Sequence, residues 1–364
     1  MLMMEFHNLI LQWYDLNKRD LPWRSTKEPY KIWVSEIILQ QTRVVNGIIY
    51  YRRFIEHFPN LHSLANADEN DVLLIWQGLG YYSRARNLHF SAKYIVDKLN
   101  SNFPNTFQDI IKLKGIGDYT ASAISSICFE EKVPAIDGNI FRILSRLFEL
   151  KESFYSNKFK TKIKKLALEI MPNNRFGDYN QALMDYGSII CKPTNPLCSE
   201  CVVSMMCKSF KKNKVHLYPV KKKKIKLKTY YYEYIIVIKE NKFLIKKIDN
   251  GIWKNLFQFP VSISKTKQTK NELIKIFSQE IGNNITKFNL INKSFIEHRL
   301  SHLKIKSRFW LVNFENNFLD GIFTNDFNRY PMSKLMYKFI NDYEIRLSKL
   351  SKFKLNNYYV RNTK

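Results

Sequence analysis

The chain has 364 residues and a formal net charge of +27, with 59 lysine and arginine residues against 32 acidic ones. Hydrophobic residues make up 45% of it and aromatic residues 15%, which excludes a disordered or collagen-like chain. No apolar run approaches the roughly 18 residues of a membrane span, and residues 1–21 lack the pattern of a secretory signal. We expect a soluble, cytoplasmic protein of about two domains whose partner is a polyanion.

The positive charge is unevenly distributed along the chain. Residues 1–207 carry 25 basic and 21 acidic side chains, a net +4, whereas residues 208–364 carry 34 and 11, a net +23. The densest stretch, residues 208–228, has ten lysines and no acid. Because like charges at this density repel each other in a compact fold, we predict an exposed linker there. Two roles for this linker stay open: it only improves solubility, or it contacts phosphates directly.

Hydrophobic spacing divides the chain at this linker. Residues 1–207 show the three-to-four-residue period of helices, for example over 32–44, 70–76 and 140–150. After the linker, runs of β-branched and aromatic residues predict strands at 230–238, 243–248 and 302–314. One helix is predicted at 271–281, before Gly282. The pattern indicates an all-α domain over residues 1–207 and an α+β domain over residues 229–364.

Four of the five cysteines follow C-x6-C-x2-C-x5-C within 17 residues, at Cys191, Cys198, Cys201 and Cys207. Disulfides at this spacing would suit a small secreted scaffold, which this chain is not. Four clustered thiolates need a metal to offset their charge, either zinc or an iron–sulfur cluster. The six- and five-residue gaps fit the short knuckles of a zinc ribbon poorly. We therefore favour an iron–sulfur cluster, with zinc as the alternative.

Residues 113–121 read Leu-Lys-Gly-Ile-Gly-Asp-Tyr-Thr-Ala, between two helical segments. Gly115 and Gly117 would let the backbone approach a ligand closely, and the N–H groups of the next helix could hold a phosphate. Alone, this pattern also fits an ordinary joint between helices. In a basic protein it predicts a helix–hairpin–helix, at about residues 108–125, that grips one DNA strand without reading its sequence. Lys114 is expected to contact a phosphate.

Two acidic residues are candidates for catalysis. Glu36 lies among Trp33, Ile37 and Leu39, and apolar neighbours raise the pKa of a carboxylic acid, which suits a general acid. The alternative is an exposed glutamate on the polar side of a helix. Asp137 directly precedes the predicted helix at 140–150, where the alternative role is a helix N-cap. A capping aspartate that stays ionised could also stabilise a cation, and two carboxylates around an oxocarbenium-like centre suit glycosidic chemistry.

The hairpin, the aspartate downstream of it and the cysteine spacing together resemble the endonuclease III, or helix-hairpin-helix, superfamily of DNA glycosylases. Four segments are similar to its adenine DNA glycosylases of the MutY type: 21–24 (Leu-Pro-Trp-Arg), 34–42 (Val-Ser-Glu-Ile-Ile-Leu-Gln-Gln-Thr), 77–87 (Gln-Gly-Leu-Gly-Tyr-Tyr-Ser-Arg-Ala-Arg-Asn) and 136–139 (Ile-Asp-Gly-Asn). The likeness is nearly continuous over residues 5–207. Residues 251–260 and 298–302 more weakly resemble that family's Nudix-like C-terminal domain.

This resemblance implies base excision repair: hydrolysis of the N-glycosidic bond of adenine mispaired with 8-oxoguanine or guanine, after base flipping, by a nucleoid-associated monomer. It makes Glu36 the general acid and Asp137 the stabiliser of the oxocarbenium sugar, with Asn139 and Tyr119 beside the reacting centre. Further positions implied by the resemblance are Arg19, Trp23, Arg24, Leu39 and Gln181 in the base pocket, Gln41 and Tyr81 at the DNA stack, and the four cysteines as ligands of a [4Fe-4S] cluster. For Tyr81, a core aromatic beside two glycines is the alternative.

At three places the sequence differs from patterns found in these glycosylases and their relatives, and each difference bears on the expected activity. Tyr119 stands where bifunctional relatives carry a lysine, as G-x-G-x-K, and has no amine for a Schiff base, so we expect a monofunctional enzyme rather than a lyase-competent pyrimidine glycosylase. The usual Phe-Ser-His tip appears as Leu-Ser-His at residues 300–302: Ser301 keeps the hydroxyl that can bind 8-oxoguanine, but the aromatic ring is gone. An ordinary strand start is the alternative for these residues. A Nudix hydrolase needs a glutamate-rich metal-binding segment. The only acidic residues within 271–282 are Glu272 and Glu280, so we expect no Nudix hydrolase activity.

Overall fold

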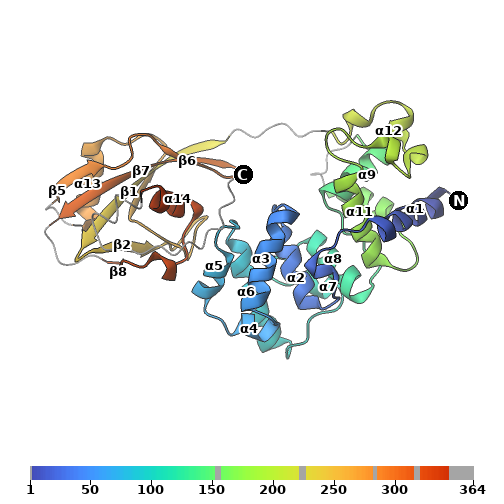
Figure 1. Ribbon diagram of the computed structural model, residues 1–364, viewed down its shortest axis with the longest axis horizontal. Coiled ribbons are helices and arrows are strands. Elements are labelled where there is room, and N and C mark those ends of the chain that lie inside the picture. Colours follow the sequence, from blue (N-terminus) through green and yellow to red (C-terminus); the bar gives the residue numbers. More distant parts are fainter. Residues whose placement is uncertain (1, 152–156, 221–226, 282–284, 315–319, 344–364) are drawn as a thin grey trace. The chain divides into compact units, whose positions relative to one another are not determined.

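The computed structural model describes residues 2–151, 157–220, 227–281, 285–314 and 320–343. Residues 221–226 of the predicted linker, and Gly282, lie outside these ranges. The chain forms two compact units (Figure 1). The first contains residues 1–66 and 87–223, and the second contains residues 67–86 and 224–364.

The first unit is helical. Its helices are α1 (Leu2–Asn17), α2 (Pro29–Leu39), α3 (Val44–His57), α4 (Leu61–Ala65), most of α6 (Ser83–Lys98), α7 (Phe107–Ile110), α8 (Asp118–Phe129), α9 (Gly138–Phe148), α10 (Asn157–Glu169), α11 (Phe176–Ile189) and α12 (Lys208–Lys211), with the 3-10 turns η1 (Pro22–Arg24), η2 (Cys198–Glu200), η3 (Ser204–Met206) and η4 (Val215–Leu217). One core joins α1, α9, α10 and α11 through buried side chains such as Ile10, Leu144 and Tyr186. A second contact layer packs α2 against α3 and α8.

Local capping explains where one further helix, which belongs to the second unit, begins. Asp68 accepts a hydrogen bond from the backbone of Asn70 at 2.7 Å, and α5 (Glu69–Trp76) follows it directly. The apolar period over residues 32–44 belongs to two helices, because the chain turns at residues 40–43 between α2 and α3. At this turn Gln41 has a φ of +58°. The predicted helices are thus confirmed, with one break that hydrophobic spacing alone did not show.

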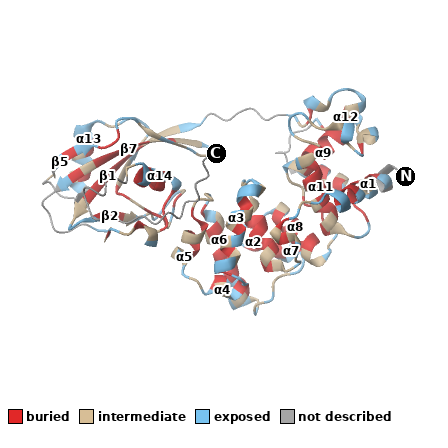
Figure 2. Cartoon of the chain, viewed as in Figure 1, coloured by how far each residue is buried: buried red, intermediate tan, exposed pale blue. Residues whose placement is uncertain are grey.

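The second unit is built around a mixed sheet. Its strands are β1 (Lys228–Lys239), β2 (Lys242–Lys247), β3 (Phe257–Gln258), β4 (Val261–Ser264), β5 (Ile285–Leu290), β6 (Ile296–Arg299), β7 (Leu303–Phe314) and β8 (Ile322–Thr324), with helices α5, α13 (Lys270–Ile281) and α14 (Lys334–Asp342). The main path runs β3-β2-β1-β7-β5. Strands β1 and β7 pair in parallel, from Lys228 opposite Leu303 to Val237 opposite Val312. Buried side chains of β1 and β7 meet Leu273 and Phe277 of α13 in one core; buried residues are red in Figure 2.

This architecture confirms an all-α part followed by an α+β part. In the described part of the chain, no strand precedes Lys228. Strands β6 and β7 form a hairpin in which Arg299 pairs with Lys304. Ser301 and His302 therefore lie in its turn, and β7 begins at Leu303, one residue after the predicted start at His302. No helix of the described residues is long and apolar enough to span a membrane.

Candidate active site

A cavity of about 210 Å³ lies in the helical unit, between η1, α2, α8, the start of α9 and α11. All the predicted catalytic residues and base-pocket residues line it: Glu36, Tyr119, Asp137, Asn139, Arg19, Trp23, Arg24, Leu39 and Gln181. Sequence reasoning missed the other wall residues, which are Leu21, Ile32, Ser35, Thr42, Val44, Ile127, Met184 and Ser188. Segments spread from residue 19 to residue 188 thus meet in one cavity with both polar and apolar walls.

Glu36 is the buried acid of this cavity, with only 5% of its surface exposed. Burial raises its pKa to about 7, while a hydrogen bond from the Tyr119 hydroxyl lowers it, nearby Asp137 raises it and Arg24 lowers it. Among the described residues, its Oε2 atom has no hydrogen-bond partner. The interpretation of Glu36 as an exposed surface residue is therefore wrong. A protonated carboxyl with a free oxygen can donate a proton to a ligand in the cavity.

Asp137 is the N-cap of α9. Its Oδ1 accepts hydrogen bonds from the backbone N–H groups of Asn139 and Ile140, both at 2.8 Å, and its Oδ2 accepts one from Asn139 Nδ2 at 2.7 Å. Burial raises the pKa of Asp137, and these N–H donors oppose that shift. The capping role is confirmed. It fixes the carboxylate in the wall of the cavity, where a capping aspartate can also face a ligand.

Arg142 connects this cap to the cysteine-bearing loop. Its Nη2 donates to Asn139 Oδ1 at 2.8 Å and to the carbonyl of Gly187 at 2.6 Å, and its Nε donates to the carbonyl of Cys191 at 2.7 Å. A Cβ on Gly187 would lie 2.5 Å from Asn139 Cβ, so α11 passes the cap only because residue 187 is a glycine. Neither Arg142 nor Gly187 was singled out from the sequence.

We expect Gly187→Ala to displace Asn139 and loosen the capping hydrogen bonds of Asp137. The single-turnover rate of the base release that the sequence predicts should fall by up to about a hundredfold, as for small misplacements in active sites. The free energy of unfolding should fall by about 1–3 kcal/mol through overpacking. Gly138→Ala is the matched control, because a Cβ at Gly138 would meet no heavy atom within 4 Å. Equal rates for the two variants would contradict the importance of this close approach.

A second buried carboxylate, Asp185 on α11, orients two arginines of the cavity wall. It accepts hydrogen bonds from Arg24 Nη1 at 2.6 Å and Nη2 at 2.9 Å, and from Arg19 Nε at 2.8 Å. Burial alone would raise the pKa of Asp185, but the hydrogen bonds from Arg24 and Arg19 outweigh it and lower the pKa. The pairing offsets positive charge beside Glu36. It joins residues more than 160 positions apart, which no local pattern indicates.

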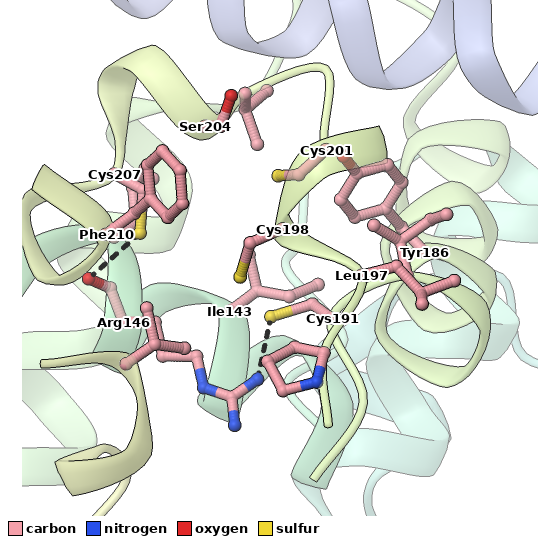
Figure 3. A pocket seen from close by; sticks show the side chains of 15 residues that line it. Ile143, Arg146, Tyr186, Cys191, Leu197, Cys198, Cys201, Ser204, Cys207 and Phe210 are labelled. Atoms are coloured by element: carbon pink, nitrogen blue, oxygen red, sulfur yellow. Dashed lines mark hydrogen bonds between the residues drawn. The ribbon is translucent and has the colours of Figure 1, made fainter. Parts of the chain in front are cut away.

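The four cysteines of residues 191–207 line one small apolar pocket at the end of α11, together with Ile143, Leu197 and Phe210 (Figure 3). Figure 3 shows their sulfur atoms around a common space. Arg146 donates to Cys191 Sγ at 3.2 Å and to the carbonyl of Lys192 at 2.7 Å, which holds the loop against α9. In the described ranges, no three His, Cys, Asp or Glu side chains are grouped to hold a single metal ion.

The predicted hairpin is formed by α7, the turn at residues 111–117 and α8. Gly115 has a φ of +87°, and a Cβ there would lie 2.6 Å from Asn87 Cβ, so a glycine is required. Lys114 is exposed, and its ammonium group lies 4.2 Å from the centre of the Phe90 ring. Gly117 precedes α8 without a side-chain cap, which leaves N–H groups of that helix for another acceptor.

The remaining predicted residues lie outside the cavity. Gln41 is exposed in the turn between α2 and α3. Tyr81 belongs to the second unit and is 44% exposed with a φ of +46°, so its interpretation as a core aromatic is wrong. Ser301 is exposed in the β6–β7 turn, where its Oγ lies 3.1 Å from His302 Nδ1.

The fold and the cavity define a class of protein. Residues 34–172 match the family model described as "HhH-GPD superfamily base excision DNA repair protein". A solved structure described as a thermostable thymine-DNA glycosylase superposes with a TM-score of 0.54 and 27% identity, over 58% of this chain and 97% of that one. The helical unit is thus that of a helix-hairpin-helix DNA glycosylase.

Sequence relatives narrow the class further. The adenine DNA glycosylase of Buchnera aphidicola subsp. Baizongia pistaciae is 39% identical over 312 residues, covering 84% of this chain and 86% of the relative. That of subsp. Schizaphis graminum is 37% identical over 351 residues, covering 94% and 96%. The chain belongs to the adenine DNA glycosylase family. It acts in base excision repair as a hydrolase of N-glycosyl bonds, as the sequence motifs predicted.

Proposed function

We propose that this enzyme removes adenine mispaired with 8-oxoguanine or guanine in double-stranded DNA, as a monomer, and leaves an intact abasic strand. One observation carries the proposal: the free oxygen of the buried Glu36 carboxyl lies in the same cavity as the capped carboxylate of Asp137. An adenine inside the duplex cannot reach these two groups, so the base must first flip out of the stack.

The chemistry begins with protonation of the base. Glu36 transfers its proton to N7 of adenine, the bond between C1′ and N9 breaks, and the bonding electron pair leaves with the base. The sugar remains as an oxocarbenium ion, which the negative charge of Asp137 stabilises. Water then adds to C1′ and gives a proton to the Glu36 carboxylate. This step restores the acid and releases adenine and an abasic site.

Three N–H groups from Asn139 and Ile140 keep Asp137 in the form that this mechanism needs. These donors stabilise the carboxylate against the effect of burial. Arg142 in turn holds the Asn139 side chain. The Tyr119 hydroxyl lowers the pKa of Glu36, which opposes the effect of burial and eases release of the proton. The role of the loop cysteines is separate from these proton transfers.

The cavity wall also supports a monofunctional enzyme. In the described residues that line it, no side chain is a lysine, and Tyr119 stands at the hairpin position of the Schiff-base lysine. The test is a single-turnover assay on duplexes with A opposite 8-oxoguanine, A opposite G, and thymine glycol. We expect adenine release from the first two, with strand breakage only after alkali. Equal breakage without alkali, or release of thymine glycol, would overturn the proposal.

Recognition of the opposite base is assigned to residues 229–364, whose β6–β7 turn presents Ser301. Its hydroxyl can hydrogen-bond the oxidised base. The net +23 of residues 208–364 would hold the duplex through its phosphates, so binding should weaken as salt rises.

We expect Leu300→Phe to sharpen the preference for 8-oxoguanine over guanine by about fivefold, the value of one added aromatic contact. The measurement is the ratio of single-turnover rates on the two mispairs. Leu300→Ala serves as the control, because it changes the side chain without adding a ring. An unchanged ratio in the phenylalanine variant would show that an aromatic residue at this tip is dispensable here.

The donor set of residues 191–207 supports a [4Fe-4S] cluster held by the four cysteines. Four thiols around one apolar pocket, with the Arg146 guanidinium beside them, suit a cluster whose thiolate ligands carry negative charge. When bound, the cluster would brace the loop that follows α11. A brown protein that contains iron and absorbs at about 400 nm would support this assignment, and a colourless zinc protein would contradict it.

A further inference from the structure

The loop that carries Tyr81 is bound to a residue 250 positions further along the chain. The buried Tyr82 hydroxyl donates to the carbonyl of Met332 at 3.0 Å. The backbone N–H of Met332 donates to Gln77 Oε1 at 3.0 Å. Both main-chain groups of Met332 are therefore bonded to the two residues that flank the turn at 78–81. All of these residues belong to the second compact unit.

The turn between these two anchors has an unusual backbone. Gly78, Gly80 and Tyr81 have φ values of +98°, +72° and +46°. An aromatic residue in the left-handed region is strained, and such strain persists only where the surroundings impose it. Within the turn, Gly80 accepts hydrogen bonds at its carbonyl from Trp76 Nε1 at 3.1 Å and from Arg84 Nη2 at 3.2 Å. The Arg84 guanidinium also lies over the Tyr81 ring.

Met332 is itself firmly held. It is buried, it forms a parallel bridge with Phe257, and the backbone of Phe257 donates to the Pro331 carbonyl at 2.8 Å. The next residue, Ser333, caps α14. Two further hydrogen bonds join residues 67–86 to the same region: Arg86 Nη1 donates to the carbonyl of Lys254 at 2.8 Å, and Asn255 donates to Glu69. The flanks of the Tyr81 turn are thus hydrogen-bonded to two paired segments, residues 254–258 and 331–333.

We infer that Met332 and the Tyr82 hydroxyl position Tyr81 for prying open the DNA stack, which makes Tyr82 a positioning residue for base flipping. The inference rests on the proposed function and on the position at the DNA stack that the sequence resemblance implies for Tyr81. Residues 224–364 then contribute to the extrusion of adenine, because main-chain groups of Met332 hold the turn that carries Tyr81. This contribution is separate from any contact of Ser301 with the opposite base. Loss of the Tyr82 hydroxyl should therefore affect A:8-oxoguanine and A:G duplexes by the same factor.

The test uses the full chain and a duplex in which 2-aminopurine, which brightens when it leaves the stack, replaces the target adenine opposite 8-oxoguanine. Tyr82→Phe removes the hydroxyl that donates to the Met332 carbonyl and keeps the ring. Gln77→Met removes the oxygen that accepts from the Met332 N–H. Each should lower the 2-aminopurine signal and the single-turnover rate by about fivefold, the value of one neutral hydrogen bond. The duplex dissociation constant should change less than twofold, and thermal melting confirms that each variant is folded. A merely structural defect would lower affinity and extrusion together.

Tyr81→Ala distinguishes a failure of the Tyr82 hydroxyl to position Tyr81 from a failure of Tyr81 itself to act in extrusion. If it lowers the signal while Tyr82→Phe and Gln77→Met match the unsubstituted enzyme, the positioning inference is wrong and the proposed role of Tyr81 stands. If Tyr81→Ala leaves the signal unchanged, the proposed role of Tyr81 is itself wrong, and the inference falls with it. A loss in Tyr82→Phe that appears with A:8-oxoguanine but not with A:G would also overturn the inference, since it would place the hydroxyl in lesion recognition.

Discussion

The Glu36→Gln variant is expected to bind A:8-oxoguanine duplexes normally and to release adenine about a hundred- to ten-thousandfold more slowly, the range for loss of a general acid. Glutamine keeps the size of the side chain and an oxygen that can accept the Tyr119 hydrogen bond. It cannot donate a proton to the adenine ring. The measurement is the single-turnover rate together with the dissociation constant of the duplex. Release at the normal rate would remove Glu36 from the mechanism.

The same substitution has a predicted effect on stability, whose sign follows from the raised pKa of Glu36. Since the folded protein binds this proton up to pH of about 7 and a free carboxyl only to about 4.5, the free energy of unfolding falls as pH rises between these values. The loss is up to about 3 kcal/mol and stays constant above that window. Glu36→Gln should therefore be more stable than the unsubstituted enzyme at pH 8, and equally stable near pH 4. Denaturant titrations at the two pH values measure this difference.

Asp137→Asn is expected to lower adenine release by about a hundred- to a thousandfold, as when an electrostatic stabiliser of a transition state is removed. Asparagine is itself a good N-cap, so the free energy of unfolding should change by less than about 1 kcal/mol. What the variant loses is the negative charge that we propose stabilises the oxocarbenium sugar. Single-turnover kinetics and denaturant titration together separate the loss of charge from a loss of fold.

Asp68→Asn is the matched control for this substitution. Asp68 also caps an α-helix, accepting from the backbone of Asn70, and it does not line the cavity. Its replacement should reproduce the small change in stability without the change in rate. If both variants lost adenine release to the same extent, the effect of Asp137→Asn would come from helix capping, and its assigned role in stabilising the sugar would be contradicted.

Local chemistry explains which parts of the site could be predicted from the sequence. Glu36 could be found because its apolar neighbours lie within three positions on either side, and Asp137 because it directly precedes a helix. The hairpin glycines and the four cysteines likewise form short spacings. Each of these features depends on residues close together in the chain, and each is found in the structure where the pattern placed it.

The features that escaped prediction depend on contacts between distant segments. Asp185 meets Arg19 and Arg24 across more than 160 residues, and Gly187 matters only because α11 crosses the start of α9 beside Asn139. Continuity along the chain also does not indicate that residues 67–86 pack with residues 224–364. The composition of a short segment carries no information about such partners, because burial and pairing are decided by the packed fold.

The pH dependence of single-turnover adenine release from an A:8-oxoguanine duplex tests most directly whether a buried Glu36 is the proton donor. Since burial raises the pKa of Glu36 to about 7, the protonated fraction falls tenfold for each pH unit above that value. We predict a rate that is level below pH 7 and declines with this slope up to pH 9, with the decline lost in Glu36→Gln. A rate that stays constant from pH 6 to pH 9 would contradict it.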